Sequence, residues 1–147
     1  MCPRQNYSEL FFLIKQVDLQ LTQVFENKLD ISVTRYEMLL HLLSATVMTQ
    51  TQLQQKMRIN QAAITRHVKI LEDKGLAIRA RNPKNNREVL VQISSAGKTL
   101  LTRCDEKKHV IIEQLFDHYS EEQMALFKAF LTDVNERSTT LLNDHTI

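Results

Sequence analysis

The stretch Ile59–Leu76, with the sequence INQAAITRHVKILEDKGL, decides how the rest of the chain is interpreted. Asn60 is a good helix N-cap, because its side-chain oxygen can accept a hydrogen bond from a free amide of the first turn. Gly75 suits the left-handed position just past the end of a helix. Between them, apolar residues recur at steps of four and three and predict one buried stripe, made of Ile64, Val68 and Leu71. We therefore predict a short amphipathic helix between Asn60 and Gly75.

The opposite face of this helix carries small, amide, hydroxyl and cationic side chains, namely Gln61, Ala62, Thr65, Arg66 and Lys69. No acidic residue follows in the helix before Glu72. A helix with an apolar back and such a front fits the major groove of DNA, where base edges offer hydrogen-bond donors and acceptors. An ordinary surface helix could look the same, so the flanking sequence has to decide.

Length and composition favour one mainly helical domain over residues 1–147. A chain of this length is most simply one domain, and its two Gly and two Pro leave little room for irregular loops. No apolar run approaches the ~20 residues that cross a bilayer, and the N-terminus lacks the apolar core of a signal peptide. Cys2 and Cys104 do not make a disulfide framework. We therefore expect a cytoplasmic protein with no membrane partner.

Charge is distributed unevenly along the chain, although the net charge is only +2. Residues 56–98 contain ten Lys and Arg against three acidic residues, a net charge of +7, whereas the rest of the chain carries −5. A charged segment is often only a solvated face. A basic segment that contains the predicted helix is instead the pattern expected where a protein meets phosphates, so nucleic acid is the favoured partner.

A helix-turn-helix is predicted over about residues 51–74. Thr49 and Gln52 have the spacing of a capping box, which starts a short helix that ends near Met57. Arg58–Asn60 then forms a three-residue turn into the helix described first. In this arrangement the second helix enters the DNA groove.

A β-hairpin follows over about residues 76–93 and completes a winged domain over about residues 32–97. Two strands, residues 76–81 and 89–93, flank a turn rich in Asn and Pro. The hairpin carries the basic residues Arg79, Arg81, Lys84 and Arg87. A basic hairpin directly after a recognition helix is typical of a wing that contacts phosphates or the minor groove, although a solvated hairpin is the alternative.

A leucine-rich helix is predicted before this pair. Either Ser32 or Thr34 can cap its start, and Thr34–Glu37 has capping-box spacing. Its core is expected to consist of Tyr36, Leu39, Leu40, Leu42 and Leu43. His41 is expected to be packed or partly exposed rather than functional.

Long helices flank the winged domain, at about residues 8–30 and 98–142. Both regions have heptad-like apolar seams, and Ser120–Gln123 has the spacing of a capping box that starts the last helix. These terminal helices are more than a single winged domain requires for its own fold. We therefore expect the terminal helices to form a homodimer, which would read a two-fold symmetric site.

In order along the chain, these segments resemble the MarR family of bacterial transcription regulators. The resemblance runs from about Tyr7 to Leu142 and rests on five motifs: ISVT (31–34), TQTQL (49–53), NQAAITR (60–66), LEDKGL (71–76) and RNPKNNR (81–87). It implies a homodimeric winged helix-turn-helix repressor. Such a repressor binds a pseudo-palindromic operator in double-stranded DNA and is usually released by a small ligand or by oxidation. No cofactor is implied.

The resemblance places Gln61, Ala62, Thr65 and Arg66 on groove-facing positions and makes Arg87 the wing arginine. The full set of predicted DNA-contacting residues is Thr51, Gln61, Ala62, Thr65, Arg66, Lys69, Arg81, Lys84, Asn86 and Arg87. One departure concerns the wing, where the family usually has Asp two residues before the arginine. This chain has Asn85 there, so a salt bridge becomes at most a neutral hydrogen bond, about half as strong.

The sequence does not identify the signal, and no ligand-binding residue can be named. Cys104 is a candidate redox residue, but it lies on the apolar face of a helix, where a thiol is usually inert. Cys2 lies close to the terminus. For metals, Glu106, His109 and Glu113 share a helix face, which a solvated charged surface explains better than a binding site.

Other classes of function fit less well. An enzyme is disfavoured, because two glycines leave no Gly-rich phosphate loop or nucleophile elbow. A protein-interaction adaptor stays open as an alternative, but it would leave the basic segment without a purpose.

Overall fold

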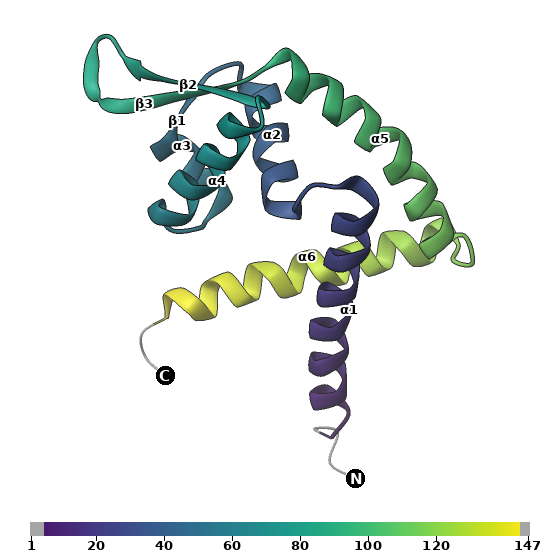
Figure 1. The fold of residues 1–147 in the computed structure, drawn as a ribbon. Coiled ribbons are helices and arrows are strands. Elements are labelled where there is room, and N and C mark those ends of the chain that lie inside the picture. The colour runs from purple at the N-terminus through teal and green to yellow at the C-terminus, as the bar shows by residue number, and fades with distance from the viewer. Residues whose placement is uncertain (1–4, 145–147) are drawn as a thin grey trace. The chain divides into compact units, whose positions relative to one another are not determined.

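A computed structural model of the protein describes residues 5–144, with side chains from residue 7 onward. Helices dominate these residues, and a small antiparallel sheet accompanies them (Figure 1). The predicted class, mainly α with a small β-hairpin, is confirmed. The chain divides into two compact units, Met1–Lys108 and His109–Ile147. That residues 1–147 act as a single domain stays a prediction.

The elements follow the predicted order, with one addition. They are α1 (Gln5–Leu29), α2 (Val33–Ala45), β1 (Met48–Thr49), α3 (Gln50–Met57), α4 (Gln61–Asp73), β2 (Ala77–Asn82), β3 (Asn85–Ile93), α5 (Ser95–Phe116) and α6 (Glu121–Asn143). The addition is β1, and the boundary between the two units lies within α5.

The core of the first unit lies between α2, α3, α4 and the sheet. Its largest fully buried side chains are Met38, Leu39, Leu42, Leu53, Ile64, Val68, Leu71 and Val91. The predicted apolar stripe of α4 is therefore confirmed. Leu40 and Leu43, predicted as core, are instead exposed. At 100° per residue, the direction shared by Met38, Leu39 and Leu42 leaves Leu40 on the opposite side of the helix and Leu43 at the edge of the buried face.

The sheet has three strands in the order β1-β3-β2, all antiparallel. The predicted hairpin is its main part, with pairing from Ala77 and Ile93 to Asn82 and Asn85. The second strand thus begins earlier than predicted, and the turn is shorter. The sequence did not reveal β1, which has two residues and pairs Met48 with Val91.

Side-chain caps set most helix starts as predicted. Thr49 and Ser120 both make complete capping boxes with the residue three positions later. At α2, Ser32 is the cap, since its Oγ accepts a hydrogen bond from the Arg35 amide at 3.2 Å. The alternative capping box at Thr34 is therefore wrong, because Thr34 already lies inside the first turn. The first helix begins at Gln5 rather than near residue 8.

The start of α5 is joined closely to the turn after α4. Gly75 has the predicted left-handed conformation, with φ of 70°, and its carbonyl oxygen accepts a hydrogen bond from Ser94 Oγ at 2.6 Å. The Ser94 amide donates to the Leu76 carbonyl oxygen at 3.0 Å. A Cβ on Gly97 would collide with that same carbonyl and with the Ile93 side chain, so only glycine fits this approach.

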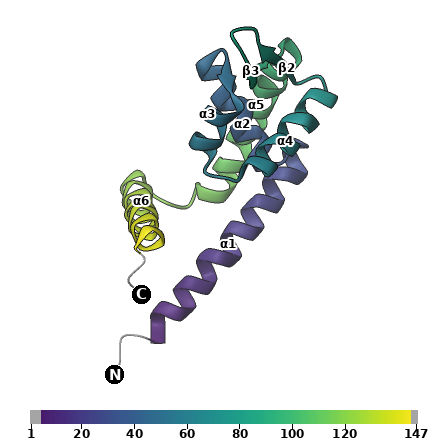
Figure 2. The same ribbon diagram turned by 90° about the vertical axis from the view of Figure 1, so that its left-hand side faces the viewer.

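Within the first unit, α1 runs out from the winged part as one long helix (Figure 2). Its C-terminal end is anchored, because Leu29 is buried and the Phe25 ring meets the Tyr36 ring edge-on at 5.1 Å between centroids. The predicted heptad seam along the rest of α1 is exposed in the single chain and comprises Leu10, Ile14, Val17, Leu21 and Val24.

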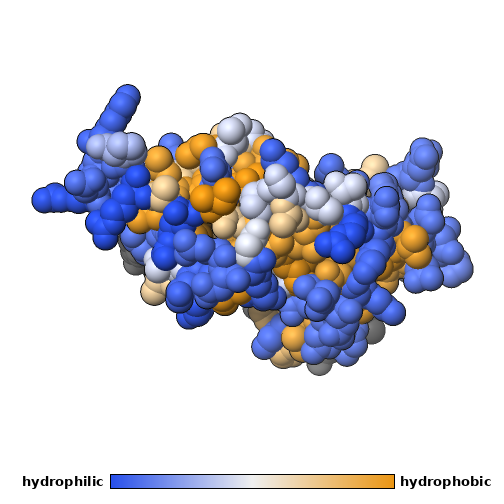
Figure 3. All heavy atoms as spheres, turned by 45° about the horizontal axis from the view of Figure 1, so that its top comes forward, coloured by the Kyte–Doolittle hydropathy of each residue, from blue (hydrophilic) through white to orange (hydrophobic). Residues whose placement is uncertain are grey.

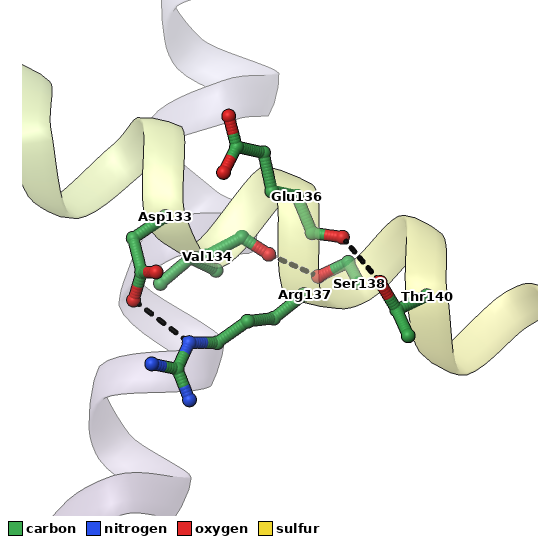
Figure 4. A network of polar contacts seen from close by, with 6 residues as sticks. All are labelled: Asp133, Val134, Glu136, Arg137, Ser138 and Thr140. Carbon is green, nitrogen blue, oxygen red and sulfur yellow. Dashed lines mark hydrogen bonds and ion pairs between the residues drawn. The ribbon is translucent and has the colours of Figure 1, made fainter.

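The second unit consists of the end of α5 and α6. Its apolar seam is also exposed, at Phe127, Leu131, Val134 and Leu141. The polar groups of α6 bond within the helix (Figure 4): Arg137 pairs with Asp133 at 2.9 Å, and hydroxyls such as that of Ser138 bond back to carbonyls. Among the helices of residues 5–144, none is both long and apolar enough to cross a bilayer.

Candidate nucleic-acid interface

The recognition helix α4 presents the predicted side chains together on one exposed face. This reading face consists of Gln61, Ala62, Thr65, Arg66 and Lys69, all exposed, and lies opposite the buried stripe. It is well supported at its start, since Asn60 Oδ1 accepts a hydrogen bond from the Ala63 amide at 2.8 Å. The helix therefore begins at a defined residue and holds its outward side chains in a defined register.

The turn between α3 and α4 has the geometry of a helix-turn-helix. Arg58 ends α3 in the left-handed conformation, with φ of 55°, and its amide bonds to the Gln54 carbonyl oxygen at 2.9 Å. Thr51, predicted to contact DNA, is exposed in the first turn of α3. Both helices of the pair thus offer polar groups outward while Leu53 anchors α3 in the core.

Sequence reasoning missed one polar residue behind the reading face. Gln50, the first residue of α3, is only 8% exposed. Its Nε2 donates a hydrogen bond to the Thr65 Oγ at 3.3 Å, and its Oε1 is buried without a partner among the described residues. No local sequence pattern could reveal this contact, because its two residues belong to different helices and meet only in the folded chain.

The wing tip is hydrophilic and exposed. Lys84, Asn86 and Arg87 lie exposed there, and Arg81 is exposed on β2; that these residues contact DNA stays a prediction. In Figure 3 the end of the molecule that carries the hairpin tip, on the left as in Figure 1, is accordingly blue. Within residues 7–144, the Lys84 ammonium and the Arg87 guanidinium have no hydrogen-bond or ion-pair partner, so both charges can meet a phosphate.

Asparagines order the turn of the wing through its backbone. The Asn85 side-chain oxygen accepts from the Arg87 amide at 3.2 Å, and that of Asn82 accepts from the Lys84 amide at 3.0 Å. The neutral hydrogen bond expected from Asn85 therefore forms, but with the backbone of Arg87. Arg81 Nη1 also donates to the Asn86 carbonyl oxygen at 3.3 Å.

Acidic residues near the interface are paired with local partners. Glu72 binds Arg79 at 2.9 Å and so links α4 to the wing, while Asp73 lies 3.6 Å from Lys69. Glu88 accepts a hydrogen bond from Asn82 at 2.9 Å. The charge of Arg79 is therefore used in an ion pair within the protein. The other cations of the reading face and the wing give the interface its positive charge.

His67 connects the recognition helix to α2. Arg35 Nη1 lies 3.4 Å from His67 Nδ1, and since arginine can only donate, His67 must be neutral at Nδ1 to accept. Burial lowers the pKa of His67 below the ordinary histidine value, and the charges of Arg35 and Arg66 lower it further. Protonation of His67 would remove the acceptor and place three cations together.

We expect His67 to make the protein less stable in mild acid. Below about pH 6.5 the unfolded chain binds a proton at this histidine while the folded chain does not, so the free energy of unfolding falls as pH falls. The measurement is chemical unfolding at pH 7.5 and 5.5, compared between wild type and His67→Gln. Between pH 7.5 and 5.5 the free energy of unfolding should fall more in the wild type than in the variant. Both proteins have the same carboxylates, so the difference between them reports His67. An equal loss in both proteins would contradict this assignment.

The residues considered for sensing do not form a reactive site. Cys104 is only 3% exposed, and burial raises the pKa of its thiol despite the nearby Lys107 and Arg103. A buried thiol that stays protonated is a poor nucleophile. Cys2 lies outside the described residues. Within the described part of the chain, no three His, Cys, Asp or Glu side chains are grouped to hold a metal.

Comparison with known proteins identifies the family. A sequence model of the MarR family matches residues 31–89. The chain is 31% identical over 137 residues to YdgJ of Bacillus subtilis, an uncharacterised HTH-type transcriptional regulator, covering 93% of this chain and 81% of that protein.

Two structures of proteins bound to DNA share the fold. One is a mutant MarR from E. coli with operator DNA, at a TM-score of 0.79 and 22% identity over 91% of this chain and 99% of that one. The other is FabT of Streptococcus pneumoniae with DNA, at a TM-score of 0.75 and 20% identity over 92% and 99%. Since YdgJ is matched over most of both sequences, the chain belongs to the MarR family of helix-turn-helix transcription regulators.

Proposed function

We propose that this regulator binds a pseudo-palindromic operator in double-stranded DNA as a homodimer and represses transcription. The observation that carries the proposal is the exposed reading face of α4, next to a wing whose Lys84 and Arg87 are unpaired within residues 7–144. Few side chains on α4 reach base edges, so phosphate contacts and DNA shape would supply much of the affinity. Both relatives crystallised with DNA have this fold and lend support.

The homodimer is supported by the two exposed apolar seams, on α1 and on α6. Exposed apolar seams of this length are unusual in a monomer and typical of a surface that another subunit covers. A two-fold dimer would carry two copies of α4, which would meet half-sites about one helical turn apart.

We also propose a cytoplasmic location and release from DNA by a small molecule. A pocket of about 220 Å³ in the first unit could accept such an effector. It is lined by Asp30, Ile31, Arg35, Leu71, Lys74, Leu76 and Leu100. Its two cations, Arg35 and Lys74, outnumber its one carboxylate, Asp30, and with the apolar side chains favour an aromatic or aliphatic carboxylate. Leu71 lies in the last turn of α4, and Lys74 is the C-cap of that helix.

A salt titration tests DNA binding. We expect the affinity for the chain's own promoter region to fall linearly with the logarithm of salt concentration. Arg87→Ala removes one phosphate contact per subunit, so the slope should become less steep by about 1.8 per dimer. Affinity should fall by a similar factor on every DNA sequence. Fluorescence anisotropy from 50 to 300 mM salt measures both quantities.

The matched control is Arg103→Ala, which removes an exposed arginine of α5 outside the basic segment. It should leave slope and affinity unchanged. A wild-type affinity that does not respond to salt would contradict the proposed function.

Effector binding has its own test. In a thermal-shift screen of aromatic carboxylates, metal ions and peroxide, we expect a carboxylate to raise Tm and weaken operator binding. A ligand at a hundred times its Kd should add about 2.7 kcal/mol of stability. If peroxide alone releases DNA, and Cys104→Ser abolishes that response, the signal is oxidation and the proposed effector class is wrong.

A further inference from the structure

One hydroxyl of the recognition helix is bonded by a side chain of another helix instead of bonding back to its own helix. Thr99, Thr132 and Thr140 each donate to the carbonyl oxygen four residues earlier, at 3.1, 2.8 and 3.2 Å (Figure 4 shows Thr140). This is the usual behaviour of threonine within a helix. Thr65, in the middle of α4, instead accepts a hydrogen bond from Gln50. Among residues 7–144, the Thr65 hydroxyl proton has no acceptor.

The orientation of the Gln50 amide follows from its burial. Gln50 is 8% exposed, and its Oε1 occupies a buried position with no donor nearby among the described residues. The reverse orientation would put an NH₂ group, with two donors, at that position. Nε2 faces Thr65 in the structure, which leaves one N–H of the amide without an acceptor, whereas the reverse orientation would leave both without one; unpaired buried N–H groups are rarer than unpaired carbonyl oxygens.

We propose that Gln50 is a positioning residue that makes Thr65 a hydrogen-bond donor toward DNA. A threonine that bonds back to its own helix presents only lone pairs outward. Thr65 instead keeps its proton for an outside partner, and the bond that it accepts from Gln50 polarises the O–H group and strengthens it as a donor. This inference rests on the proposed function, in which α4 enters the major groove.

The consequence is a base preference at one position of each half-site. A donor hydroxyl favours base edges that present an acceptor, which in the major groove are guanine N7 and O6, adenine N7 and thymine O4. It disfavours cytosine, which presents only its N4 amino group there, whereas adenine presents an acceptor and a donor and suits either polarity. One neutral hydrogen bond of this kind corresponds to about three- to tenfold discrimination.

The test changes the polarity of the buried partner. In Gln50→Glu, the introduced carboxylate can only accept, so Thr65 must donate to it and present lone pairs to the DNA. We would select operators from a randomised duplex pool with the full-length protein at pH 8, where the carboxylate is ionised. Wild type should select an acceptor edge at one position per half-site. Gln50→Glu should shift that position alone away from guanine and thymine and toward cytosine, by about three- to tenfold.

Three variants serve as controls. Thr65→Val should remove the preference at the same position, and adding Gln50→Glu to it should change nothing further there. Gln50→Met, which fills the space without a hydrogen bond, should weaken the preference; thermal melts establish that each variant folds. Gln55→Glu adds the same charge on the exposed side of α3 and should lower affinity for all sequences equally.

The outcomes separate the two claims. If wild type selects no sequence from the pool, the proposed function fails. If wild type selects an operator but Gln50→Glu behaves like Gln55→Glu, with lower affinity and unchanged base preference, DNA binding stands and the role of Gln50 is overturned.

Discussion

Replacing Arg66 with alanine is expected to lower affinity for the operator by about 100-fold or more. Arg66 lies exposed at the centre of the reading face, between Thr65 and the neutral His67, and its side chain can reach a guanine edge with two donors. Such a bidentate contact discriminates by about 1–3 kcal/mol, and a dimer loses two copies of it. The loss should be concentrated at one base pair of each half-site, where sequence preference should relax.

Binding to operator and to unrelated DNA of the same length measures this effect. Affinity for unrelated DNA should fall much less, because only the phosphate part of the interaction is affected there. Arg103→Ala again serves as the control. Equal losses on both DNAs would assign Arg66 to the phosphate backbone and contradict a base-reading role.

Placing carboxylates in the α6 seam is expected to separate the dimer and to remove operator binding with it. In the double variant Phe127→Glu and Leu131→Glu, two charges lie one turn apart on the exposed apolar seam. Burying them against a partner would require their desolvation, which costs several kcal/mol per ion. A monomer holds only one α4, so the gain from linking two half-site contacts, about 10²- to 10⁴-fold, disappears.

Sedimentation and operator binding, measured on the same samples, check this prediction. The control variant, Ala129→Glu with Thr132→Glu, adds the same charge to other exposed positions of α6 and should stay dimeric. A seam variant that remains dimeric would show that the interface lies elsewhere. A monomer with full operator affinity would contradict the role of the dimer in DNA binding.

The parts of the fold that could be predicted are those set by neighbouring residues. The capping box at Thr49, the cap at Asn60 and the left-handed Gly75 each act within one or two turns, and the structure confirms all three. The exclusion of an enzyme is confirmed through membership of a family of transcription regulators. Each reading-face residue also lies where the helical period places it.

The parts that could not be predicted depend on contacts across the fold. Strand β1 has two residues and exists only because Met48 meets Val91, more than forty positions away. The exposure of Leu40 depends on which side of α2 meets the core. Gln50 and Thr65 are fifteen residues apart, and neither residue type signals the other. Where the predicted contacts meet DNA stays a prediction.

The tight junction between Gly75, Ser94 and Gly97 has a mechanical consequence. Because hydrogen bonds and a close approach of the backbone join these residues, we expect the end of α4 and the first turn of α5 to move together. If α5 tilts, α4 should tilt with it, and the orientation of the reading face should change. Within the first unit, a change in the orientation of α5 would pass to α4 through this junction, without rearrangement of the side chains between them.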